Sequence, residues 1–82
     1  MSRYGFVGIT INTEITTGIE VQKILTTYSH IIMGRMGIPA VEDGSISVIT
    51  LIVKTTTDEL GALTGKLGRL NGVNVKSGLC KV

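Results

Sequence analysis

The chain has 82 residues, of which one is cysteine, 17% are charged and 43% are hydrophobic, and its formal net charge is +2. This length leaves room for one domain, predicted to span residues 1–82, and a lone cysteine excludes a disulfide within the chain. The lysines and arginines are scattered along the sequence, which argues against a direct nucleic-acid partner, because such binding needs a basic patch.

The apolar composition favours a homo-oligomer, a dimer or a tetramer. Small domains bury a limited share of their surface, and this chain has neither disulfides nor a histidine cluster to support it. The first residues, MSRYGFVG, lack the apolar core of a signal peptide, and no apolar stretch is long enough to span a bilayer. We therefore expect a cytoplasmic protein that contacts no membrane.

The N-terminal third predicts a strand followed by a helix. Apolar and polar residues alternate over Arg3–Thr13, which is typical of a half-buried strand. Its buried side carries Val7, Ile9 and Ile11. A helix is predicted over Ile19–Ser29, with Thr16 or Thr17 available as its cap. The apolar stripe of this helix consists of Val21, Ile24, Leu25 and Tyr28.

The middle of the sequence predicts strands joined by a hairpin. The first strand covers His30–Pro39, where glycines suggest a bend or bulge and Pro39 should end the strand, because proline cannot donate to a ladder. The Asp43-Gly44 pair is a hairpin signal. The second strand covers Ser45–Thr55 and is apolar on both faces in its middle, as expected of a central strand with both faces covered.

The segment DELGALTGKLGRLNG predicts a helix that is rich in glycine. Thr57 is positioned to cap it, and its leucines share one face. Its glycines fall in a different sector and form a bare backbone strip, the glycine strip: Gly61, Gly65 and Gly68. Such a strip lets another helix or a ligand approach closely, with Lys66 and Arg69 reaching over its edge. The alternative is that the glycines only kink the helix or have no role.

The order of these elements predicts the fold. The glycine-rich helix should end near Leu70, where Asn71-Gly72 follows, and the alternating VNVKSGLCKV predicts a last strand. Strand, helix, strand, strand, helix, strand is the order of the α+β ferredoxin-like fold, a four-stranded antiparallel sheet with two helices on one face. We expect another subunit to cover the opposite face, which carries Tyr4 and Phe6.

Arg35 carries the strongest signal for a ligand. It lies in an apolar strand between Gly34 and Met36. A guanidinium buried there needs an anionic ligand or an Asp or Glu partner, and otherwise it must reach the surface. Gly37 would allow a ligand to approach the backbone beside it.

Metal and catalytic sites have little support in the sequence. His30 and Cys80 are the only residues of their types, too few for a four-ligand zinc site within one chain, although a metal shared between chains stays an alternative. We interpret His30 as a cap or strand-entry residue and Cys80 as a buried small hydrophobe. Because no base with an oriented partner is visible, we do not expect an enzyme.

The stretches IIMGRMGIP and SISVITLIVKTTTDELGALTGKLGRLNGVNVKS resemble the family of regulators of the iron-only hydrogenase system. The similarity covers most of the chain and is strongest from Tyr28 onwards. It implies an ACT-like, ferredoxin-like fold and a regulatory role, since ACT-like domains bind small molecules at subunit interfaces. The nickel-responsive repressor has a similar domain, but only His30 and Cys80 are available here as metal ligands, so nickel sensing is not implied. The sequence also lacks a ribbon-helix-helix, so DNA binding is not implied either.

These observations favour a regulatory domain that binds a small molecule at a subunit interface, with the cofactor or ligand left unidentified. The alternative is a ligand-free module for protein interaction or assembly, in which the glycine strip packs against a helix. The residues predicted to bind the ligand are Asn12, Thr13, Arg35, Gly37 and Lys66. The residues predicted at an interface are Tyr4, Phe6, Gly61, Gly65, Gly68 and Arg69.

Overall fold

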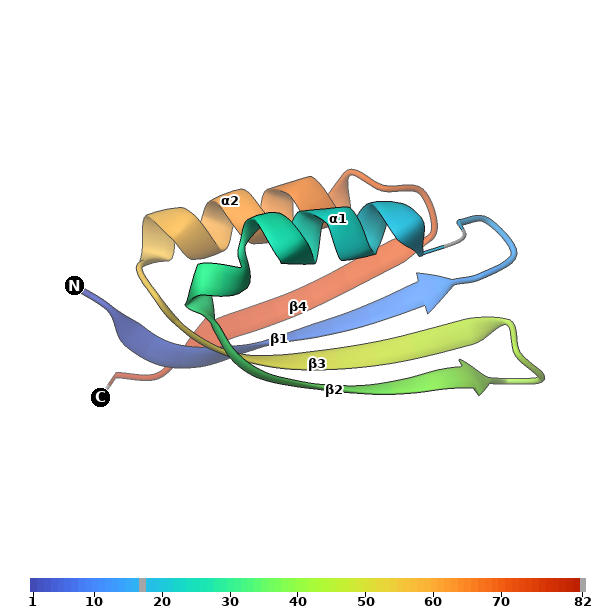
Figure 1. Cartoon of the computed structure of the whole chain (residues 1–82), viewed down its shortest axis with the longest axis horizontal. Helices are drawn as coiled ribbons and strands as arrows, with labels where there is room; N and C mark the ends of the chain where they lie inside the picture. Colours follow the sequence, from blue (N-terminus) through green and yellow to red (C-terminus); the bar gives the residue numbers. More distant parts are fainter. Residues whose placement is uncertain (17, 82) are drawn as a thin grey trace.

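An antiparallel sheet with helices on one face organises the chain (Figure 1). The computed structural model describes residues 1–16 and 18–81. Over these residues the elements are β1 (Arg3–Asn12), α1 (Ile19–Thr27), the 3-10 turn η1 (Ser29–Ile31), β2 (Ile32–Val41), β3 (Ile46–Thr55), α2 (Thr57–Gly68) and β4 (Val73–Leu79). The four strands lie in the order β2-β3-β1-β4, and all neighbours are antiparallel. The predicted α+β ferredoxin-like fold is confirmed.

The register of the two central strands explains how the alternating sequence builds a core. β1 pairs with β3 from Arg3↔Thr55 to Asn12↔Ile46, so alternate residues of both strands face the helices. The buried residues of this helix-covered face are Val7, Ile9, Ile11, Ile49, Leu51, Val53 and Thr55, and the helices contribute Val21, Leu25, Leu60, Leu63 and Leu67. Their removal from water is the main stabilising term of the fold.

The ends of α2 differ in detail from the sequence prediction. Thr56, not Thr57, is the cap: its side chain accepts a hydrogen bond of 3.2 Å from the backbone N–H of Glu59. Thr57 is instead the first helical residue, because its neighbour already supplies the oxygen that satisfies the helix start. The helix ends at Gly68, and Gly72 closes the connection to β4 in a left-handed conformation with φ 79°, as glycine there predicts.

The start of α1 does not use the threonine cap that the sequence predicts. Gly18 occupies the cap position with φ 85° and makes no side-chain cap hydrogen bond. The side chain of Thr16 accepts from the N–H of Gly18 at 3.4 Å and so lies two residues before the cap position. The alternative, Thr17, lies outside the described residues. The helix ends at Thr27, and His30 belongs to η1 rather than to a strand.

The β2–β3 hairpin accommodates its proline. The predicted bulge in β2 is confirmed as a register shift between Ile32 and Gly34. Pro39 does not end β2, which continues to Val41, because a second irregularity between Ile38 and Val41 removes the need for its missing N–H. The turn that follows holds Glu42, Asp43 and Gly44 at φ 51°, 58° and 87°.

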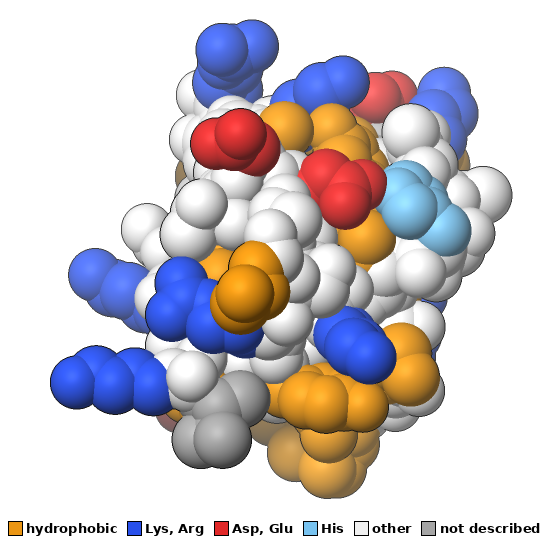
Figure 2. All heavy atoms as spheres, turned by 90° about the vertical axis from the view of Figure 1, so that its left-hand side faces the viewer, with side chains coloured by type: hydrophobic (Ala, Val, Ile, Leu, Met, Phe, Trp, Pro, Cys, Tyr) orange, Lys and Arg blue, Asp and Glu red, His pale blue; other side chains and the backbone are white. Residues whose placement is uncertain are grey.

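The other face of the sheet is exposed and combines large apolar side chains with the cations of Lys54 and Lys76. Large hydrophobic side chains that stand on it include Tyr4, Phe6, Met36, Ile38 and Ile52, each about half exposed or more. Figure 2 views the molecule from the end where both termini lie, and its hydrophobic side chains gather at the bottom, on the sheet side. No helix among residues 1–16 and 18–81 has the length and apolar character needed to cross a membrane.

Candidate functional site

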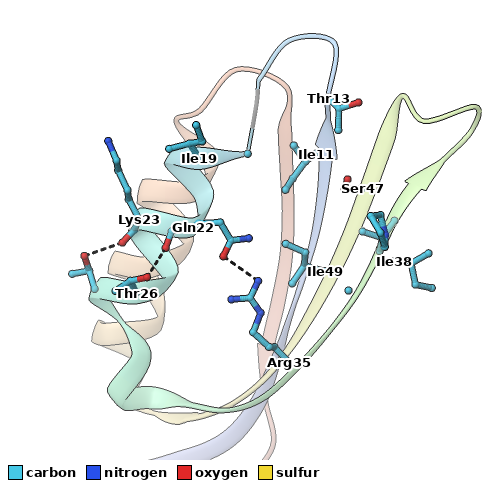
Figure 3. A pocket seen from close by; sticks show the side chains of 15 residues that line it. Ile11, Thr13, Ile19, Gln22, Lys23, Thr26, Arg35, Ile38, Ser47 and Ile49 are labelled. Carbon is cyan, nitrogen blue, oxygen red and sulfur yellow. Dashed lines mark hydrogen bonds between the residues drawn. The ribbon is translucent and has the colours of Figure 1, made fainter.

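A groove of about 790 Å³ lies between α1 and the β2–β3 side of the sheet, on the helix-covered face (Figure 3). One wall is the sheet-facing edge of α1, which presents Gln22, Thr26 and Thr27. The floor is formed by β1 and β3 with the buried side chains of Ile11 and Ile49. The groove exists because the helices pack over the centre of the sheet and leave the outer strand β2 open.

Arg35 reaches into this groove from β2. It pairs with Leu51 of β3, which is a helix-facing position, and its Nη2 donates a 3.1 Å hydrogen bond to Oε1 of Gln22 across the groove (Figure 3). The side chain is exposed rather than buried. Among residues 1–16 and 18–81 no Asp or Glu forms an ion pair with it, so these residues do not supply the acidic partner that the sequence left open.

The groove is polar on its rim and apolar on its floor. Hydroxyl and amide groups line the rim, from Thr13, Gln22, Thr26, Thr27 and Ser47. The Thr26 hydroxyl donates to the carbonyl oxygen of Gln22 at 2.9 Å. Cations come from Lys23 and Arg35, while no Asp or Glu is among the described lining residues. Such a combination of apolar surface with a few directed polar groups is typical of small-molecule sites.

The structure brings together some of the residues predicted to bind a ligand. Arg35, Gly37 and Thr13 line the groove. The Thr13 hydroxyl donates to the carbonyl oxygen of Gly44 at 2.7 Å and thereby ties the β1–α1 turn to the hairpin. Asn12 does not line the groove; its side-chain oxygen accepts from the N–H of Glu14 at 3.0 Å. Lys66 is also elsewhere, with its Nζ 5.7 Å from the ring centroid of Tyr28.

Several groove residues were not predicted from the sequence, although the pattern of polar and apolar residues contains a signal for them. Gln22 and Thr26 are four residues apart on α1, so they form a polar stripe beside the buried stripe of Val21 and Leu25. Ser47 breaks the apolar run of β3 on the same face as Ile49. A polar residue among apolar neighbours at a helix-facing position was the available signal.

The glycine strip lies where the spacing of its glycines predicted, on the outer face of α2. Its glycines are exposed, and a Cβ added at any of them would meet nothing within 4 Å. The opposite face holds the buried leucines of α2, Leu60, Leu63 and Leu67. Arg69 follows as the exposed C-cap residue. The strip is therefore a stretch of accessible helix backbone, separate from the groove.

The polar cluster at the start of α2 joins elements rather than forming a metal site. Nε2 of His30 lies 2.6 Å from Oε2 of Glu59, and the buried Thr55 hydroxyl donates to the same carboxylate at 3.4 Å. Among the residues that the structure describes, no three His, Cys, Asp or Glu side chains gather in a way that could hold a metal. Cys80 is exposed rather than buried, because it stands opposite Tyr4, whose carbonyl oxygen accepts from its N–H at 2.7 Å, and strand alternation places both side chains on the open face of the sheet.

Comparisons with known proteins give the chain a family context. The model of the TM1266-like family, provisionally described as regulators of the iron-only hydrogenase system, matches residues 3–77. The solved structure of the uncharacterized protein TM1266 from Thermotoga maritima is similar, with 33% identity and a TM-score of 0.91 over 99% of this chain and 100% of that one. No curated protein matches the sequence.

Two more distant structures share the fold alone. The ACT domain of GTP pyrophosphokinase from Chlorobium tepidum is 22% identical, with a TM-score of 0.70 over 95% of this chain and 100% of that one. CPII, a nitrogen regulatory PII-like protein from Thiomonas intermedia K12 solved with ADP, AMP and bicarbonate, is 11% identical, with a TM-score of 0.50 over 98% of each chain.

Proposed function

The chain belongs to the TM1266-like family of iron-only hydrogenase system regulators, and from that premise we propose that it is a homo-oligomeric regulatory domain that binds a small molecule. The groove between α1 and the β2–β3 hairpin is the observation that carries the proposal. Its volume of about 790 Å³ falls in the range of small-molecule sites, about 300 to 1,000 Å³. Its rim supplies directed polar groups, and its floor is apolar.

The fold supports the same proposal. The PII-like protein binds ADP, AMP and bicarbonate on a similar arrangement of strands and helices, so this architecture is compatible with ligand sensing, although fold alone does not determine a ligand. Asn12 shapes the β1–α1 turn next to the groove, and Lys66 lies on the outside of α2. If either contacts a ligand, that contact would involve a second copy of the chain.

The exposed sheet face supports self-association. Across the four strands Gly34, Ile52, Phe6 and Gly78 stand in one row, in which two large side chains are flanked by glycines with open space above them. A hollow of about 290 Å³ lies at Gly34, beside Met36 and Ile52. When two such faces pack together, the ridge of one copy can fill the hollows of the other. Water would then be removed from Tyr4 and Phe6 as well.

A groove-filling variant tests the ligand site. A Cβ at Gly37 would contact the carbonyl oxygen of Val48 at 3.7 Å and Cγ1 of Ile49 at 3.8 Å, which is ordinary packing, so Gly37→Leu should fold normally while its side chain occupies the groove. In a thermal-shift screen of common metabolites, we expect at least one compound to raise the melting temperature of the unmodified protein, and we expect Gly37→Leu to lose that shift.

Ala62→Leu is the matched control, because it adds a larger side chain at an exposed position of α2 without touching the groove. It should keep the ligand-induced shift. If Gly37→Leu responds to the metabolite as the unmodified protein does, the groove is not the site. If no metabolite stabilises the unmodified protein, the sensing proposal itself fails.

The second candidate function, a module for protein interaction, is favoured by the open glycine strip. Gly65→Ala should raise helix stability by up to about 1 kcal/mol and still permit close approach. Gly65→Leu should also favour the helix but hold a partner helix away. We expect light scattering to show a smaller assembly for Gly65→Leu than for Gly65→Ala. An unchanged assembly in both variants would reject the strip as an interface.

A further inference from the structure

The charged side chains that line the groove are cations. Of the described residues that line it, Lys23 and Arg35 are cations and none is an acid. Lys23 pairs with Glu20 at 3.5 Å, and Figure 3 shows its side chain directed away from the floor. Arg35 is therefore the cation that faces the groove, and in the described residues no carboxylate neutralises it.

The donors of Arg35 are mostly available. A guanidinium carries five N–H donors, and within the described residues its hydrogen-bond partner is Oε1 of Gln22, at 3.1 Å. That bond uses the oxygen of the Gln22 side chain, so the amide nitrogen, also a pair of donors, is left facing the same space. A planar group with two acceptor oxygens can bridge these donors, because guanidinium binds carboxylate and phosphate through parallel hydrogen bonds.

The floor requires a second property of the ligand. Ile11 and Ile49 form its apolar base, and Gly37 leaves the space above them without a side chain. Ile19, which also lines the groove and is 59% exposed, adds apolar surface that faces water. An inorganic anion alone would fill a small part of about 790 Å³ and would leave this apolar surface wet. A ligand with an apolar body beside its charge removes that surface from water. A cationic ligand would instead be repelled by Arg35.

We infer that the groove binds a small organic anion, whose carboxylate or phosphate is held by Arg35 and Gln22 and whose apolar body lies on Ile11 and Ile49. This inference rests on the proposed sensing function and specifies its ligand class. A carboxylate and a phosphate would be recognised by the same hydrogen-bond donors. The test below therefore includes a probe of each kind.

Matched probes of one shape and three charges test the inference. Indole-3-acetate, indole-3-acetamide and tryptamine share an indole ring and carry a negative, a neutral and a positive group, respectively. A second pair, phenyl phosphate and 3-phenylpropanoate, compares a phosphate with a carboxylate on a phenyl ring. We expect titrations followed by amide NMR shifts to place the anions at Thr26, Arg35 and Ser47. The acetate should bind at least about tenfold more tightly than the acetamide, since a hydrogen bond to a charged group contributes about that factor.

Variants assign the preference to one residue. Arg35→Gln removes the positive charge and keeps an amide that can still pair with Gln22, so it should bring the acetate and the acetamide to similar affinities. Lys81→Gln makes the same charge change at an exposed position outside the groove and should leave the tenfold preference intact. Circular dichroism spectra of both variants that match the unmodified protein would exclude misfolding as the cause.

The outcomes separate the two proposals. If the acetamide or tryptamine perturbs the groove amides as strongly as the acetate, the groove is a ligand site and the anionic class is wrong. If the preference survives Arg35→Gln, Arg35 is not the recognition residue and the inference is overturned. If no probe perturbs groove amides and no metabolite stabilises the protein, the sensing function fails together with its ligand class.

Discussion

Gly5→Ala should lower the free energy of unfolding by about 2 to 3 kcal/mol, which corresponds to a melting temperature lower by roughly 10 to 20 °C for a domain of this size. A Cβ at Gly5 would overlap the carbonyl oxygen of Gly78 and would lie 2.7 Å from Cδ2 and 3.1 Å from Cα of Leu79. The Leu79 side chain can rotate away, but the backbone atoms cannot. The strands β1 and β4 must therefore separate where Gly5 pairs with Leu79.

Gly37→Ala is the matched control for this effect. It makes the same change in a strand of the same sheet, but its nearest contacts would be 3.7 and 3.8 Å, and the position faces away from the proposed subunit interface. Thermal and urea unfolding should show Gly37→Ala to be as stable as the unmodified protein or slightly more stable. Equal losses in both variants would mean that the cost reflects strand glycines in general and not the close approach of β4.

Phe6→Glu should convert the proposed homo-oligomer into a monomer. Phe6 is 55% exposed in the single chain and stands beside Ile52 in the middle of the apolar face. The substitution should leave the monomer fold within about 0.5 kcal/mol, as is usual for exposed positions. In a face-to-face assembly it removes the large apolar side chain at the centre of the contact and takes a carboxylate out of water, which costs several kcal/mol for each charge before any pairing with Lys54 or Lys76 of the same face. Sedimentation analysis over a range of protein concentrations measures the change.

Ile15→Glu controls for the loss of an exposed hydrophobic residue. Ile15 is 60% exposed but lies in the β1–α1 connection rather than on the free sheet face, so the assembly should persist. If Phe6→Glu and Ile15→Glu assemble alike, the sheet face is not the interface. If the unmodified chain is a monomer at every concentration, the proposal of self-association is wrong.

The fold could be predicted because its signals are local and repeated. The alternation in β1 and the leucine spacing of α2 each reflect a single periodic face, and the structure buries those faces. In β3, which the sequence predicts to be apolar on both faces, only alternate residues from Ile49 onward are buried within the chain. Element ends were less predictable. Thr56 and Thr57 are chemically alike, so only the approach of the Glu59 N–H decides which of them caps α2. Pro39 remains inside β2 because the neighbouring irregularity absorbs it.

The candidate site was predictable only in part. Arg35 and Gly37 stand out in an apolar strand, and both line the groove. Gln22 faces Arg35 from a helix that is 13 residues away in the sequence, and nothing in either segment signals the pairing. Cys80 was predicted to be buried by its residue type, whereas strand alternation places it opposite Tyr4 on the open face of the sheet.

The sequence by itself determined the order of the elements, the faces that β1 and the two helices bury and the position of the glycine strip, because hydrophobic periodicity is a property of consecutive residues. Only the tertiary structure decided that the helices leave the outer strand β2 open, that Arg35 meets Gln22 and, among the described residues, no carboxylate, and that Gly5 lies against the backbone of β4. These features depend on distances between elements that are remote in the sequence, and such distances are set when the whole core packs at once.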